Sequence, residues 1–163
     1  MRLQVGQRVL HFVLERKLGE GGFGEVWLAK AGMAHTALKF VSVAGEDLEK
    51  GRKEYNRIRW GIEKGLFNHD RLIKMNGVWL LNEQMEDIPD AVLESALGGR
   101  TMELKEAVVE PDTLLIQMDL GQESLASLLK RSRKDAREGE LKGVPTERLL
   151  PFIWQAAEGI DFL

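Results

Sequence analysis

Residues 18–26 read LGEGGFGEV, and further along the chain residues 36–39 read TALK. In the first stretch Gly19, Gly21 and Gly24 form the pattern G-x-G-x-x-G. Because glycine has no Cβ, its backbone can adopt positive φ and approach phosphate oxygens closely. The stretch therefore predicts a loop that holds the phosphates of a nucleotide.

The same glycine pattern occurs in dinucleotide-binding folds, where it opens a helix and precedes an acidic residue about 20 positions later. Here Gly24 leads into Val26, Trp27 and Leu28, which are typical of a strand. Lys39 then lies inside another stretch with strand character. A glycine hairpin followed by a strand lysine argues against a dinucleotide-binding fold.

Residues 19–26 match G-x-G-x-x-G-x-V at every fixed position. Residues 36–39 resemble V-A-I-K, with Thr in place of Val and Leu in place of Ile. In this order the two motifs resemble the eukaryotic-type serine/threonine protein kinase family. The resemblance covers the amino-terminal lobe and the start of the carboxy-terminal lobe. It implies a phosphotransferase that moves the γ-phosphoryl group of ATP to protein hydroxyls, with Mg²⁺ in the complete domain.

The expected fold is α+β and kinase-like: a five-stranded antiparallel sheet with one helix, followed by helices of an incomplete carboxy-terminal lobe. Three strands with short links precede a segment in which Tyr55, Ile58, Ile62 and Leu66 recur at helical spacing. The expected domains are an amino-terminal extension (1–10), the amino-terminal kinase lobe (11–120) and the helices after the hinge (121–163).

Two further strands are expected around 72–81 and 113–118. Between them, residues 84–112 are strongly acidic and contain prolines and a Gly-Gly pair, which predicts an inserted loop. The loop is either a solvated insertion or a segment that binds a partner. The basic run at 130–137 is likewise either a solvated helix face or a docking surface.

The kinase resemblance assigns roles to individual residues. It implies that Lys39 contacts the α- and β-phosphates, that Val26 and Ala37 enclose the adenine ring, and that Phe23 folds over the phosphates. In the hinge between lobes, Met118 would stand behind the adenine. The full set expected to bind nucleotide is Leu18, Gly19, Glu20, Gly21, Gly22, Phe23, Gly24, Val26, Ala37, Lys39, Met118, Asp119, Leu120 and Gly121.

Within this hinge, the backbones of Asp119 and either Gly121 or Leu120 are expected to bond the adenine edge. Lys39 also needs a carboxylate partner from the following helix, which would hold it in place and keep it protonated. Glu54 is the first choice, because it precedes the apolar stripe of that helix, and Glu49 is the alternative. Lys39 and Glu54 are therefore the expected catalytic residues of this chain.

The motifs that act on the γ-phosphate do not occur in the sequence. H-R-D, D-F-G and A-P-E are all absent, and residues 151–163 resemble the kinase helix that precedes the catalytic loop. We therefore expect a truncated domain with no metal ligands of its own and no transfer activity alone. The alternative is a non-catalytic nucleotide-binding scaffold, either pseudokinase-like or a gene fragment.

Composition narrows the remaining classes of function. The net charge is -3, so no basic surface for nucleic acid is expected. Cysteine is absent, which excludes disulfides and thiolate metal sites. Neither a signal peptide nor an apolar stretch of membrane-spanning length occurs, so a cytoplasmic protein is expected. The expected partners are ATP and a protein substrate whose identity stays open.

Overall fold

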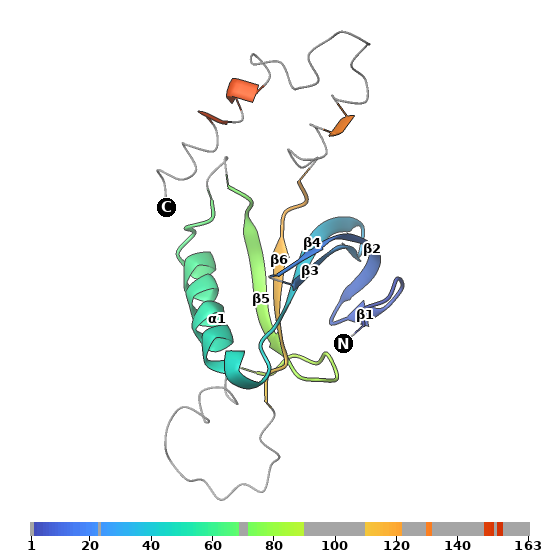
Figure 1. The fold of residues 1–163 in the computed structure, drawn as a ribbon, viewed down its shortest axis with the longest axis vertical. Helices are drawn as coiled ribbons and strands as arrows, with labels where there is room; N and C mark the ends of the chain where they lie inside the picture. Colours follow the sequence, from blue (N-terminus) through green and yellow to red (C-terminus); the bar gives the residue numbers. More distant parts are fainter. Residues whose placement is uncertain are drawn as a thin grey trace, which may run out of the picture.

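The computed structural model describes residues 2–22, 24–68, 72–89, 110–121, 130–131, 149–151 and 153–154. Six strands there form one antiparallel sheet in the order β1-β2-β3-β4-β6-β5, and helix α1 packs along β5 (Figure 1). The elements are β1 (Arg8–Val9), β2 (Phe12–Gly21), β3 (Gly24–Ala31), β4 (Ala34–Ser42), the 3-10 turn η1 (Gly45–Asp47), α1 (Leu48–Glu63), β5 (Met75–Leu81) and β6 (Thr113–Met118).

This arrangement confirms the predicted α+β fold with an antiparallel sheet, and it adds β1 as a sixth strand. The predicted helices after the hinge fall mostly outside the described residues; those described, 130–131, 149–151 and 153–154, are helical. No helix within the described ranges is both long enough and apolar enough to cross a membrane.

Glycines affect how closely α1 packs and where it ends. Its buried residues Gly51, Tyr55, Ile58 and Gly61 recur at helical spacing and face the sheet. A Cβ on Gly51 would overlap the side chain of Val43, so this glycine permits close packing of the helix. Beyond the helix, Gly65 has a φ of 68°, a conformation that commonly terminates helices.

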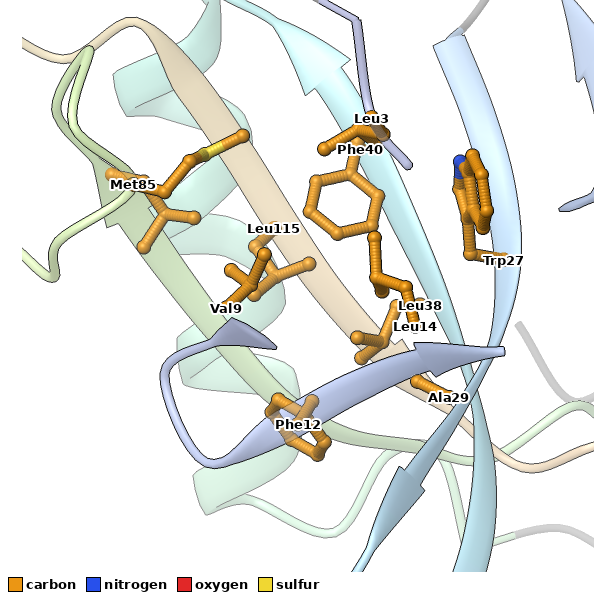
Figure 2. Close-up of a cluster of buried hydrophobic side chains, with 11 residues drawn as sticks. Leu3, Val9, Phe12, Leu14, Trp27, Ala29, Leu38, Phe40, Met85 and Leu115 are labelled. Carbon is orange, nitrogen blue, oxygen red and sulfur yellow. The ribbon is translucent and has the colours of Figure 1, made fainter. Parts of the chain in front are cut away.

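One face of the sheet is covered by the amino-terminal residues. Leu3 and Val9 are buried there, and Gly6 N donates a 2.7 Å hydrogen bond to Leu14 O. Residues 1–10, expected as an extension, thus contribute to the core of the lobe. The full cluster, drawn in Figure 2, is Leu3, Val9, Phe12, Leu14, Trp27, Ala29, Leu38, Phe40, Leu81, Met85 and Leu115.

The opposite face of the sheet packs against α1. Tyr55 and Ile58 of the helix meet Ile116 of β6 in a second buried cluster. The buried members of this cluster are Val43, Tyr55, Ile58, Leu80, Ile88, Leu114 and Ile116. The sheet is therefore apolar on both faces, with the amino-terminal segment on one and the helix on the other.

Both ends of the acidic stretch at 84–112 belong to the fold. Met85 is buried in the first cluster and Ile88 in the second. Ile88 N donates to Leu80 O at 2.9 Å, and Asp112 N donates to Leu81 O at 2.9 Å. Met85, Ile88 and Asp112 are thus held against the sheet by burial or by backbone hydrogen bonds, and the choice between a solvated insertion and a partner-binding segment stays a prediction. Residues 90–109 lie outside the described part.

We expect Ile88→Ala to lower the free energy of unfolding by about 2–5 kcal/mol, because it leaves a cavity under α1. Val5→Ala is the matched control, since Val5 is 71% exposed. Urea denaturation followed by far-UV circular dichroism measures both. Equal midpoints for the two variants would contradict the placement of Ile88 in the core.

Candidate functional site

Strand β4 gathers the predicted site residues on one face of the sheet. Leu38 and Phe40 are buried in the amino-terminal cluster, so Ala37 and Lys39 lie on the opposite face, toward α1. Across the strands, Lys39 pairs with Val26 of β3, which in turn pairs with Gly19 of β2. The strand register therefore brings the glycine hairpin and the lysine into one row.

A second row on the same face joins this site to the hinge. Ala37 pairs with Leu28 of β3 on one side and with Met118 of β6 on the other. Ala37 is buried and Met118 is half-buried. Two alternate positions on β4 thus connect the glycine hairpin to the end of β6. Phe23, expected at the hairpin tip, lies outside the described residues.

The glycines of the hairpin differ in what their missing side chains would meet. Gly24 has a φ of 100°, and a Cβ there would overlap the carbonyl oxygen of Phe40. At Gly19, Gly21 and Gly22 a Cβ would meet nothing within 4 Å, and their φ values lie outside the left-handed range. The fold itself requires only Gly24 to be glycine; the other three leave space open above the hairpin backbone.

Gly24→Ala should lower the free energy of unfolding by at least about 2 kcal/mol, because it combines left-handed strain with overlap. Gly22→Ala is the control, and its change should stay within about 0.5 kcal/mol. Thermal denaturation of both variants measures the difference. If Gly24→Ala is as stable as Gly22→Ala, the backbone at residue 24 does not lie against the carbonyl oxygen of Phe40.

Two side chains that sequence reasoning missed bind the end of β6, where the hinge is predicted. Thr36 Oγ1 donates a 2.7 Å hydrogen bond to Met118 O. Asn76 Nδ2 donates to Asp119 Oδ1 at 2.7 Å, and Asp119 N donates to Lys74 O at 2.9 Å. Because the Asp119 N–H is engaged, its carbonyl is the backbone group left for a ligand. The sequence signal for the first of these contacts is Thr36 itself, which stands where the kinase lysine motif has Val.

Thr36→Val should lower the free energy of unfolding by about 1 kcal/mol, because the Met118 carbonyl loses its hydroxyl donor. Thr36→Ser keeps the donor and should retain most of the stability. Guanidinium denaturation of the wild type and the two variants measures the effect. If Val proves as stable as Thr at this buried position, the hydroxyl does not secure the hinge.

The predicted carboxylate partner of Lys39 lies beside the buried face of α1. Glu54 precedes the buried Tyr55, its side chain is 49% exposed, and its carboxylate lies 3.6 Å from Arg57 of the same helix. Glu49, the alternative, pairs with Lys53 at 3.3 Å. Each glutamate thus has a cation partner on α1, and a pair between Glu54 and Lys39 stays a prediction.

A charged cluster lies on the outer face of the glycine hairpin. Lys17 Nζ is 2.5 Å from Glu20 Oε2 and 3.0 Å from Glu25 Oε1, while Trp27 Nε1 donates to Glu25 Oε2 at 2.9 Å. The pKa of Glu25 lies below its usual range. The main cause is the hydrogen bond from Trp27, and the contact with Lys17 lowers it further. The hydrogen bonds to Glu20 and Glu25 raise the pKa of Lys17.

A separate groove of about 310 Å³ lies between α1 and β5, lined in part by Tyr55, Ile62 and Val78. It includes none of the residues predicted to bind nucleotide. Among the described residues, no group of three acidic or histidine side chains could hold a metal ion.

Comparison with solved structures identifies the architecture. The matching structures include crystal structures of the Mycobacterium tuberculosis PknI kinase domain, among them two mutant forms and one that carries no mutation in its name. Their TM-scores are 0.60, 0.61 and 0.59 at 18%, 16% and 18% identity, and each match covers 99% of this chain. The chain has the fold of a protein kinase. It spans about half the length of those kinase domains, since 51–52% of each is covered.

Within the matched part of the kinase fold, the six-stranded sheet and α1 correspond to the predicted amino-terminal lobe. This fold assignment rests on structure, because no family model and no characterised protein matches the sequence.

Proposed function

We propose that this chain is the ATP-binding part of a serine/threonine-type protein kinase, which transfers the ATP γ-phosphoryl group to protein hydroxyls in the complete domain. The observation that carries the proposal is the row of Gly19, Val26 and Lys39 beside the row of Ala37 and Met118. The strand register thus supports a site in which a phosphate loop, a cation, an apolar wall and a hinge would share one face of the sheet.

The open space at the hairpin supports a phosphate ligand. A Cβ on Gly19, Gly21 or Gly22 would contact no protein atom, so the fold does not require glycine there. A polyphosphate lying against this backbone does require it, because each added side chain would occupy the ligand's place. The sequence has glycine at all three positions.

The chain's own residues would divide the work of binding. Lys39 carries a positive charge on the face of the sheet that bears Val26 and would hold the α- and β-phosphates. Val26 and Ala37 would cover the adenine ring, and the Asp119 carbonyl would accept a hydrogen bond from it. Bound Mg²⁺ would neutralise phosphate charge in the complete domain. The motifs that supply its ligands in kinases, H-R-D-x-x-x-x-N and D-F-G, do not occur in this sequence.

The alternative function, a non-catalytic nucleotide-binding scaffold, would use the same site. The two functions differ in the residues that act on the γ-phosphate, and H-R-D and D-F-G do not occur in this sequence. A protein substrate and a cytoplasmic location are parts of the kinase proposal.

The proposal is tested by titrating the 163-residue chain with a fluorescent ATP analogue and displacing it with ATP. We expect saturable binding that Lys39→Met weakens at least about tenfold, because the phosphates lose a charge-assisted hydrogen bond. Lys30→Met is the matched control, since Lys30 is an exposed lysine on the neighbouring strand β3, and should bind like the wild type. Absence of saturable binding, or equal binding by both variants, would overturn the proposal.

A further inference from the structure

The outer face of the glycine hairpin carries an arrangement that a regular strand could not produce. Lys17 and Glu20 are three residues apart on β2, and side chains at that spacing normally point to opposite faces of a sheet. The register shifts between Lys17 and Gly19, so that Lys17 pairs with Trp27 and Glu20 with Glu25. This bulge at Leu18 puts all four side chains on one face.

At the hairpin, two carboxylates lie opposite each other on the same face. Glu20 and Glu25 are direct cross-strand partners, and like charges in that position destabilise a strand pair. Lys17 lies within ion-pair distance of both carboxylates. Its ammonium therefore compensates two negative charges that would otherwise repel each other at the base of the glycine tip.

Lys17 is more constrained than a lone surface ion pair, which contributes little. Its side chain is 35% exposed and that of Glu25 is 26% exposed. Glu25 is also fixed from its other oxygen by the indole of Trp27, which belongs to the buried amino-terminal cluster. The cluster thus ties the hairpin tip to the hydrophobic core.

We infer that Lys17 is a positioning residue for phosphate binding, and this inference rests on the proposed function. Lys17 lies on the face opposite Val26 and Lys39, so it acts through the hairpin and not by contact with the nucleotide. It holds β2 and β3 together beside the glycines. It also offsets part of the negative charge of Glu20 and Glu25, which would otherwise repel the phosphates more strongly across the thin hairpin.

The inference predicts a difference between ligands with and without phosphates. Lys17→Met should weaken ATP and ADP binding by about fivefold and should change adenosine binding much less. A loss of general stability would weaken all three ligands equally. Lys50→Met is the control, because Lys50 forms an exposed ion pair with Asp47 at 2.8 Å at the start of α1 and not in the hairpin.

Charge-restoring variants complete the test. Lys17→Arg should bind ATP like the wild type. The triple variant Lys17→Met, Glu20→Gln, Glu25→Gln should regain most of the lost ATP affinity, because no uncompensated carboxylates remain. Hydrogen exchange without ligand should be faster across residues 17–27 in Lys17→Met than in Lys50→Met.

The outcomes separate this inference from the function on which it rests. If the wild type binds no nucleotide, the proposed function fails and the inference fails with it. If the wild type binds ATP and Lys17→Met binds it within about twofold, only the role of Lys17 is refuted. Equal losses for ATP and adenosine also refute that role and leave ATP binding intact.

Discussion

Leu38 is fully buried on one face of the sheet, and because side chains alternate along a strand, Lys39 must lie on the other. Strand β4 is paired on both sides, with β3 and with β6, so this alternation is passed to its neighbours through the register. A shift of one residue would move the lysine into the apolar cluster and Leu38 into the site. The burial of Leu38 and Phe40 therefore determines that the charge of Lys39 lies on the opposite face of the sheet, which faces α1.

The amino-terminal segment packs on the face of the sheet opposite the candidate site. It therefore supports the site without covering it. Phe12 and Trp27 are large buried side chains in that cluster, and each contributes roughly 1.5–3 kcal/mol by leaving water. Their burial supports β2 and β3 from behind. The hairpin can therefore expose an open backbone on the site face while its strands remain anchored.

Much of this architecture could be predicted from the sequence, because the signals are local. The glycine pattern and the strand lysine define the hairpin and β4, and the helical spacing of Tyr55 and Ile58 defines α1. Met85 and Ile88 gave no such signal. They are isolated apolar residues in an acidic stretch, and only the tertiary fold pairs Ile88 with Leu80.

The charged cluster could not be predicted for a different reason. Lys17 and Glu20 are at a spacing that a regular strand places on opposite faces, so their contact depends on a bulge that no residue pattern indicates. Thr36 is an intermediate case. It was visible as a departure from the kinase lysine motif, but its hydrogen bond to Met118 required knowledge of the β4–β6 register.

The fold requires glycine at only one of the hairpin glycine positions, Gly24. This difference between the glycines gives a criterion for interpreting sequence divergence among relatives with this fold. A lineage that stopped binding nucleotide would be released from selection at Gly21, where a side chain meets no protein atom. It would not be released at Gly24, where the carbonyl of Phe40 excludes any other residue. Retention of Gly24 alone therefore reports only that the fold survives, whereas retention of Gly19 and Gly21 beside it is what the proposed phosphate binding predicts.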